Sequence, residues 1–253
     1  MLLVDVYNST TSLVDIQEEW TREQGRRRIV LIGDTHSLHD ILSIPTGDIL
    51  LFHGDIFFQS RGGPWIHEVA GLEYLHAFNG FLSGLPHTHK LVIAGNHDHI
   101  LQKLGPAKTK EVLSEAIYLH DETRVVEGLR IHGTPVSTSL HTRNQAFQVE
   151  RASAEERETL NGFWSTLRGV DILVTHGLDP AHKVFAALAR DGQMIPNHES
   201  ILPLRVHVHG HIHGGYGVQF QEKICSINAA SVDNEFCLVN PPIVIDVFDK
   251  FST

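Results

Sequence analysis

Oxygen and imidazole groups that can bind metal ions recur in five short segments of this 253-residue chain. The segments are Asp34-Thr35-His36, Gly54-Asp55, Gly95-Asn96-His97-Asp98, His176 and Gly210-His211-Ile212-His213. Their carboxylate, amide and imidazole groups are the donors that hard and borderline divalent cations prefer. The seven candidate ligands are Asp34, His36, Asp55, Asn96, His176, His211 and His213. They exceed the roughly four ligands of one zinc ion, so they predict two ions about 3.5–4 Å apart with one bridging carboxylate.

The spacing inside two of the segments predicts paired side chains. Asp34 and His36 are two residues apart, as are His211 and His213. In an extended segment residues i and i+2 lie on the same side, so each pair is expected to point together. Glycines precede Asp55, Asn96 and His211. We expect them at sharp exits from strands, where a Cβ atom would crowd the metal or the substrate.

The elements that must position these donors are buried strands. Apolar, β-branched runs precede the five segments, and they cover residues 28–32, 49–52, 91–94, 172–175 and 205–208. Each donor therefore follows the end of a strand, which is typical of a site at the edge of a sheet. Apolar residues between 65 and 78 recur every three to four positions and predict an amphipathic helix between the second and third strands. A strand–helix–strand order implies parallel pairing.

The rest of the chain predicts further strands. Runs at 116–119, 123–126 and 129–132 are expected to be antiparallel, with a hairpin turn at Glu127-Gly128. Runs at 216–220, 223–228 and 243–247 are expected to complete a second, mainly antiparallel set. Residues 134–149 read as an irregular, substrate-facing flap before a helix near 154–167.

The predicted fold class is α/β: two mixed β-sheets packed as a sandwich and flanked by helices. The sequence lacks repeats and linkers, so residues 1–253 are expected to form one domain. Residues 1–25 are a weakly patterned N-terminal extension, expected to hold an edge strand near 4–7 and a short helix.

Composition restricts the partners. The formal charge of −10 disfavours long nucleic acids, because a phosphate backbone is usually met by a basic surface. No apolar run reaches the roughly 18–20 residues that a membrane-spanning helix needs, and only two cysteines are present. These features predict a cytoplasmic protein with no membrane partner. The sequence leaves the oligomeric state open.

Taken together, the ordered motifs D-x-H, GD, GNHD, H and GHxH resemble the calcineurin-like metallophosphoesterase superfamily. Residues 207–217 and 240–246 resemble most the metallophosphoesterase-domain-containing branch, which is related to class III cyclic nucleotide phosphodiesterases. By this resemblance, one metal ion is held by Asp34, His36, Asp55 and His213. The other is held by Asp55, Asn96, His176 and His211, which makes Asp55 the bridge.

The resemblance also implies a mechanism. A hydroxide that bridges two divalent ions, which are Mn, Fe or Zn, attacks phosphorus in line. His97 is free to protonate the leaving oxygen or to stabilise phosphoryl charge, and Asp98 is expected to orient its imidazole. Asn96, His97 and Arg143 are the candidate substrate contacts. His53 is expected to support the ligands, not to bind metal.

The predicted function is hydrolysis of phosphodiester bonds in small nucleotides, cyclic ones among them. A phosphomonoesterase or a protein phosphatase is the alternative within the same chemistry, because specificity lies in loops such as 134–149 and 177–200. A non-catalytic, protein-binding scaffold is the alternative from another class. Scaffold members of this fold have usually lost ligands, and retention of all seven donors favours an enzyme.

Overall fold

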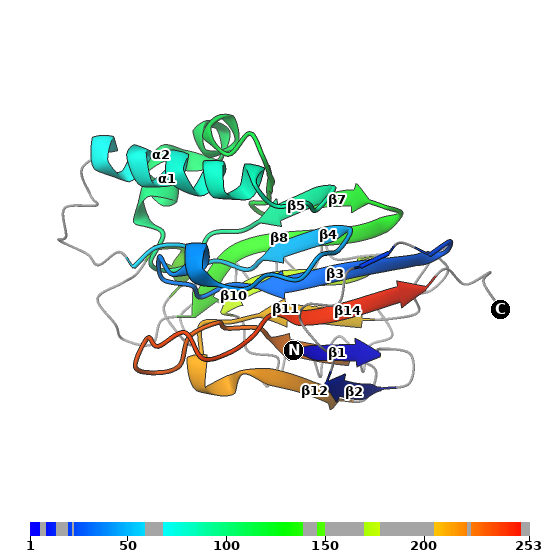
Figure 1. The fold of residues 1–253 in the computed structure, drawn as a ribbon. Helices are drawn as coiled ribbons and strands as arrows, with labels where there is room; N and C mark the ends of the chain where they lie inside the picture. The colour runs from blue at the N-terminus through cyan, green and yellow to red at the C-terminus, as the bar shows by residue number, and fades with distance from the viewer. Residues whose placement is uncertain are drawn as a thin grey trace.

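Two seven-stranded β-sheets, packed face to face, form the body of the computed structural model (Figure 1). The structure describes residues 1–5, 9–13, 20–21, 23–58, 68–138, 146–149, 170–177, 205–221 and 224–248. None of the helices in these ranges is both long and apolar enough to span a membrane.

The first sheet has the strand order β2-β1-β14-β3-β4-β5-β6. Its strands are β1 (Leu2–Asp5), β2 (Thr10–Leu13), β3 (Arg26–Ile32), β4 (Ile49–Phe52), β5 (His89–Val92), β6 (Ile117–Tyr118) and β14 (Ile243–Phe248). β3, β4, β5 and β6 run parallel to one another, and β14 is antiparallel to β3.

The second sheet has the order β12-β13-β11-β10-β8-β7, with β9 paired to β8. Its strands are β7 (Glu122–Val126), β8 (Leu129–Thr138), β9 (Gln148–Val149), β10 (Ile172–Gly177), β11 (Arg205–His209), β12 (Gly217–Gln221) and β13 (Ile224–Asn228). β8, β10, β11 and β13 are parallel, whereas β7 and β12 are antiparallel edge strands.

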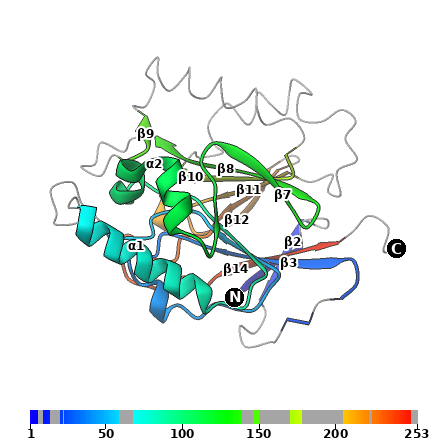
Figure 2. The same cartoon turned by 90° about the horizontal axis from the view of Figure 1, so that it is seen from above.

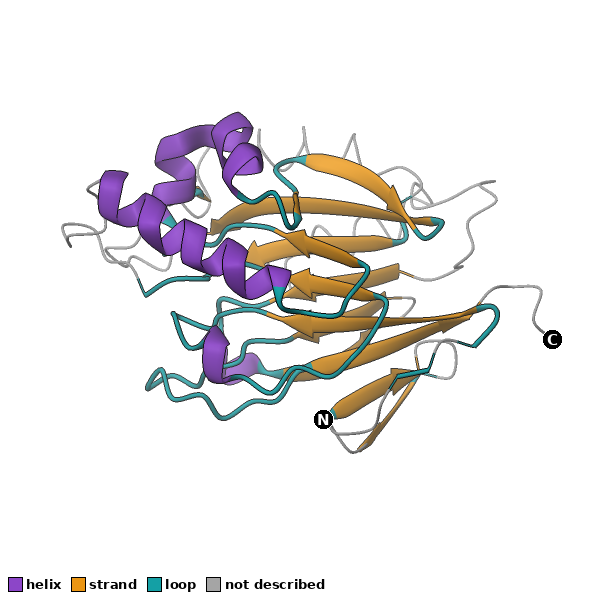
Figure 3. Cartoon of the chain, turned by 45° about the horizontal axis from the view of Figure 1, so that its top comes forward, coloured by secondary structure: helices purple, strands orange, loops and turns teal. Residues whose placement is uncertain are grey.

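Alternate residues of a strand face opposite sides of the sheet, and the structure has an apolar core on each side. In β3, Ile29 and Leu31 face the core between the sheets, and Val30 and Ile32 face a second core beneath the helices. That second core contains side chains of α1 (Glu68–Ser83) and α2 (His99–Val112). Figure 2 shows α1 lying across the outer side of the first sheet, and Figure 3 shows the helices grouped there. This full burial on both faces accounts for the unbroken apolar runs of β3, β4 and β5.

α2 is bent in its middle. Gly105 has a left-handed φ of 73°, and Pro106 follows it. Proline lacks the amide hydrogen that a continuous helix would need, so the bend separates two helical segments within one element. Two short 3-10 helices, η1 (His39–Ile41) and η3 (His213–Gly215), follow β3 and β11.

The α/β fold class and the two-sheet sandwich are confirmed, as are the strands before the five donor segments. The Glu127-Gly128 hairpin is also confirmed. Both residues have positive φ, 51° and 80°, as a two-residue turn of the mirror-image type requires. Whether residues 1–253 form one domain stays a prediction.

Several expectations about pairing were wrong. β6 joins the first sheet by parallel pairing with β5 and is not part of an antiparallel set. β14 also lies in the first sheet, between β1 and β3, and not in the second. Pairing partners depend on tertiary contacts, which local pattern does not encode.

Other differences concern segment boundaries. Residues 10–13 form strand β2, and β2, not β1, is the edge strand. The short helix expected before residue 25 stays a prediction, because residues 14–19 lie outside the described residues. The expected irregular flap at 134–149 begins and ends as strand, in β8 and β9. The helix expected near 154–167, Arg143 and most of the loop at 177–200 lie outside the described residues.

Candidate metal centre

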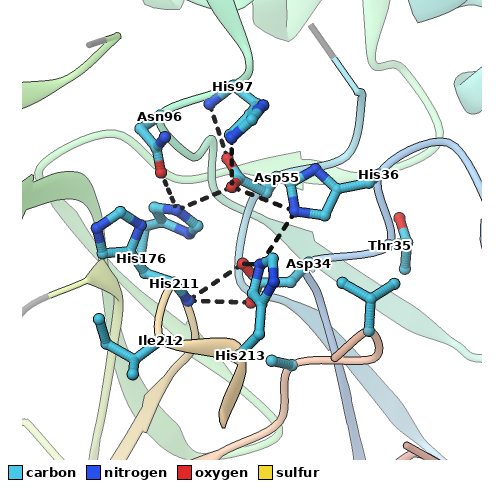
Figure 4. Close-up of polar contacts among 12 residues, drawn as sticks. Asp34, Thr35, His36, Asp55, Asn96, His97, His176, His211, Ile212 and His213 are labelled. Carbon is cyan, nitrogen blue, oxygen red and sulfur yellow. Dashed lines mark hydrogen bonds and ion pairs between the residues drawn. The ribbon is translucent and has the colours of Figure 1, made fainter. Parts of the chain in front are cut away.

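The five donor segments meet where strands of both sheets end. Asp34 and His36 follow β3, Asp55 follows β4 and Asn96 follows β5, all in the first sheet. His176 lies near the end of β10, and His211 and His213 follow β11, in the second sheet. Figure 4 shows these side chains turned toward one another. The site therefore spans the ends of two sheets, whereas the sequence predicted the edge of one.

One group of donors comprises Asp34, His36 and His213. His36 Nε2 is 3.1 Å from His213 Nε2, and His213 Nε2 is 3.6 Å from Asp34 Oδ1. The side chains of Asp34 and His36 are buried. Ligand atoms this close together, on two segments far apart in the sequence, can surround a single ion.

A second group comprises Asp55, His176 and His211, and Asn96 lies beside it. His176 Nε2 is 2.8 Å from Asn96 Oδ1 and 3.4 Å from Asp55 Oδ2. All seven predicted ligands are thus brought together, and these two groups are parts of the two sets that the resemblance implied. Two further groups, Asp34 with His53 and His176, and His36 with Asp55 and His97, offer other combinations of ligand atoms. Their assignment as ligands remains a proposal.

Asp55 lies between the two groups. Its Oδ2 atom is 3.4 Å from His176 Nε2 on one side and 3.7 Å from His36 Nε2 on the other. Its Oδ1 atom accepts a hydrogen bond of 2.8 Å from the backbone N–H of His97. One carboxylate placed in this way can serve two ions at once, which is what a bridging ligand does.

The protonation of the imidazoles fits a metal centre. His213 Nδ1 lies 3.0 Å from the carbonyl oxygen of Asp233, and His176 Nδ1 lies 3.1 Å from that of His53. Because a carbonyl only accepts, each Nδ1 carries a proton, so the inward-facing Nε2 is the atom that can bind a metal ion once it has lost its own proton. His36 Nε2 and His213 Nε2 then face each other, an arrangement that a shared proton or a cation satisfies. The donor set therefore fits divalent ions.

The two carboxylates are ionised despite their burial. Burial raises the pKa of Asp34, but its interaction with His213 outweighs this and holds the pKa well below its usual range. Burial likewise raises the pKa of Asp55, but the charge of nearby His176 outweighs the burial and holds that pKa well below its usual range. Burial lowers the pKa of His176, yet Asp55 raises it to about 9. Divalent ions compete with such protons, so metal loading at neutral pH should release protons.

Four donors have left-handed backbone conformations. The φ angles are 45° at Asp34 and His36, 51° at Asp55 and 66° at His211. β3 ends at Ile32, so the predicted pairing of Asp34 with His36 does not come from extended, period-2 geometry. Non-glycine residues pay roughly 1–2 kcal/mol for such angles, and residues with this strain often lie at functional sites.

Glycines leave the space that the donors occupy, whereas the sequence predicted that they leave space for the metal or the substrate. A Cβ atom on Gly210 would overlap the Asp34 carboxylate, and one on Gly95 would overlap the Asp55 carboxylate. A Cβ on Gly95 would also lie 2.7 Å from His176 Cε1. The added Cβ atoms would therefore clash with the side chains of the candidate ligands.

Replacing Gly95 with alanine should weaken metal binding by about 10–100-fold, because Asp55 and His176 must move apart. Calorimetric titration of the metal-free protein with Mn²⁺ measures this. Gly80→Ala is the matched control, since a Cβ there meets no atom within 4 Å. Wild-type affinity in the Gly95→Ala variant would contradict the geometry.

Comparison with known proteins identifies the family. Residues 27–215, a range that contains all seven donors, match the calcineurin-like phosphoesterase family. The chain belongs to the calcineurin-like phosphoesterase family. Membership implies that this protein hydrolyses phosphate esters, and the His/Asp cluster accords with the divalent metal binding of such enzymes.

Curated relatives of this phosphoesterase support the assignment. Metallophosphoesterase domain-containing protein 1 of Homo sapiens is 34% identical over 250 residues, which cover 88% of this chain and 72% of the human protein. A UPF0046 protein of Caenorhabditis elegans is 32% identical over 247 residues, covering 88% of this chain and 82% of the worm protein. The likeness extends beyond the metal centre to most of the chain.

His53 supports the centre of this phosphoesterase from beneath. Its ring fills a space walled by Gly33 and Gly210, where a Cβ atom would meet it at 2.6 Å or less. Its Nδ1 atom is 3.4 Å from Asp34 Oδ2, and burial lowers its pKa. The ring thus packs against Asp34 and the His53 carbonyl contacts His176. Asp34, His53 and His176 together could also hold an ion, so the supporting role of His53 stays a prediction.

Asp98 has contacts that the sequence did not suggest. Its buried carboxylate accepts hydrogen bonds from the backbone N–H groups of Gly95, Ile56 and Phe57, at 2.7, 3.3 and 3.1 Å. Burial, and then the charge of Asp55, raise its pKa to about 7. Asp98 thus joins the loop after β4 to the loop after β5. Its predicted action on the His97 imidazole stays a prediction.

Asp233 was missed by sequence reasoning. Its carbonyl holds His213, and its Oδ1 atom accepts hydrogen bonds from the N–H groups of Glu235 and Cys237. An Asp that opens a polar loop is a turn signal, but it does not reveal that the turn touches a candidate metal ligand.

Proposed function

We propose that this protein is a two-metal phosphodiesterase that hydrolyses small nucleotides, cyclic ones among them. The observation that carries the proposal is the position of Asp55 between two complete groups of donors. Two ions held there would supply an ionised water and neutralise the oxygens of a phosphoryl group.

The residues of the chain divide the remaining work. Asp34, His36, Asp55 and His213 would hold one ion, and Asp55, Asn96, His176 and His211 the other. His97 would stabilise or protonate the departing oxygen, because its Nε2 atom lies 4.0 Å from Asp55 Oδ2 and its side chain retains 12% exposure. Asn96 contributes a second polar contact at the same loop. The acidic balance of the chain supports a small substrate over a long polyanion.

Metal-reloaded protein tests this function directly. The protein is stripped, supplied separately with Mn²⁺, Fe²⁺ or Zn²⁺, and assayed with bis(p-nitrophenyl) phosphate and p-nitrophenyl phosphate. A phosphodiesterase should cleave the diester faster than the monoester. The reverse ratio would identify a phosphomonoesterase or protein phosphatase, and failure on every ester with all three metals would favour a scaffold.

A panel of cyclic nucleotides and linear nucleotide diesters then tests the substrate class. Turnover of nucleotide diesters at rates at or above that of the aryl diester supports the nucleotide assignment. Turnover of the aryl diester alone contradicts it.

We also propose that this activity is located in the cytoplasm, because the chain has only two cysteines.

A further inference from the structure

Two phenylalanines stand exposed beside the polar metal centre. The exposed fraction is 50% for Phe58 and 37% for Phe236. Exposed apolar side chains that contact each other form an apolar patch, and such patches can mark ligand-binding sites. Phe58 and Phe236, called the aromatic pair below, therefore call for a functional explanation.

The aromatic pair lies directly against the donor imidazoles. The Phe236 ring is 4.8 Å from that of His36 and 5.2 Å from that of His213, in both cases nearly perpendicular. The Phe58 ring is 5.8 Å from that of His36 and lies roughly parallel to that of His97 at 6.0 Å. The two phenyl rings are 5.0 Å apart and nearly perpendicular. They form one apolar wall along the histidine side of the centre.

The backbone holds Phe236 in this position at a cost. Its φ is 61°, an angle that a bulky residue rarely adopts. The turn that enforces it is fastened by Asp233, which accepts the Phe236 N–H on its backbone oxygen at 3.0 Å. The same oxygen receives the hydrogen bond of His213 Nδ1. The strained turn and a metal ligand thus share one anchor.

Phe58 is tied to the opposite donor loop. Its backbone N–H donates a 3.1 Å hydrogen bond to Ser37 Oγ, one residue after His36. Phe58 is consequently positioned by the loop that carries His36, and Phe236 by the turn that binds His213. A wall fixed in this way can orient a substrate with respect to the ions.

We propose that the aromatic pair recognises a flat aromatic group carried by the substrate, either an aryl group or a nucleobase, while the phosphoryl group sits at the metals. This proposal rests on the proposed function and names a determinant of its specificity. Phenyl rings stack on aromatic groups and gain less from small aliphatic ones, so an aromatic ester should be preferred over an aliphatic ester of equal charge.

Two pairs of product-like probes, one of phosphonates and one of monoesters, test the proposal by calorimetry on the Mn²⁺-loaded full chain. Phenylphosphonate is compared with methylphosphonate, and adenosine 5′-monophosphate with ribose 5-phosphate. We expect the aromatic member of at least one pair to bind about 10-fold or more tightly. A preference in the first pair alone indicates an aryl group next to phosphorus, and a preference in the second indicates a nucleobase.

Variants Phe58→Leu and Phe236→Leu keep apolar bulk but remove the ring. Each should reduce the aromatic preference several-fold while the affinity for methylphosphonate or ribose 5-phosphate stays within about twofold. Phe236→Tyr should retain the preference. Tyr74→Leu, which removes a 40% exposed ring on α1, is the matched control and should change nothing.

The outcomes separate this proposal from the function itself. If wild type hydrolyses diesters but shows no aromatic preference, or if the leucine variants weaken both members of a pair equally, the aromatic pair has no recognition role and the phosphodiesterase stands. If the preference is present and ring-dependent but no diester is cleaved, the recognition role stands and the phosphodiesterase does not.

Discussion

Replacing His97 with alanine is expected to leave both metal ions bound and to lower kcat by about 10²–10⁴-fold. The imidazole is not needed to hold Asp55, because the bond from His97 to Asp55 Oδ1 comes from the backbone N–H and survives the substitution. What disappears is the group that would protonate or stabilise the leaving oxygen. Metal content by elemental analysis and kcat on the aryl diester measure the two effects separately.

Leaving-group dependence sharpens this prediction. If His97 donates a proton, loss of the imidazole should slow esters of aliphatic alcohols more than p-nitrophenyl esters, whose leaving group needs no proton. An equal effect on both would indicate charge stabilisation instead. His76→Ala, on the exposed side of α1, is the control. Loss of metal from the His97→Ala protein would make His97 a ligand, which its proximity to His36 and Asp55 permits.

Replacing Asp98 with alanine is expected to lower the free energy of unfolding by about 2–4 kcal/mol, because three backbone N–H groups lose their shared acceptor. The loops that carry Asp55 and Asn96 would then separate, so metal affinity should fall as well. Denaturant unfolding of the metal-free protein and Mn²⁺ titration check the two parts. Asp98→Asn keeps one acceptor oxygen, so its stability and its metal affinity should lie between those of the wild type and those of Asp98→Ala.

A matched control distinguishes loop positioning from general stability. Asp171 is also buried and lies just before β10, at the other end of that strand from His176. Its carboxylate accepts a 2.7 Å hydrogen bond from the backbone N–H of Arg130. Asp171→Ala should lower stability and leave metal affinity unchanged. If Asp98→Ala behaves like His97→Ala, with kcat reduced and stability intact, then Asp98 acts on the imidazole as the sequence interpretation held.

The sequence predicted which side chains come together better than it predicted the backbone conformation that brings them together. Strands such as β3 and β4 can be recognised in the sequence as apolar runs, because both faces of each strand are buried. The pairing of Asp34 with His36 was attributed to extended backbone, yet both residues are left-handed, and no residue pattern signals a strained loop of non-glycine residues. The site's use of both sheets was also missed, because it depends on how the sheets stack.

Contacts between distant segments account for the other omissions. Asp98 was interpreted by its neighbour in sequence, His97, but its hydrogen bonds include two amides about forty residues earlier. Asp233 and Phe236 lie in a loop of ordinary turn composition, and only the folded chain brings them to His213 and His36. Local propensity is silent on such long-range packing.

Because the candidate donors are distributed over two sheets, metal ions bound there would stabilise the fold as a whole. Ions held there would link strand ends of the first sheet to those of the second, and an unfolded chain has no such arrangement. Each tenfold rise in free metal above its dissociation constant then adds about 1.4 kcal/mol to the free energy of unfolding per site. Thermal unfolding with different metals would therefore rank their affinities without any substrate. In a cell, metal supply would set how long this protein survives as well as how fast it works.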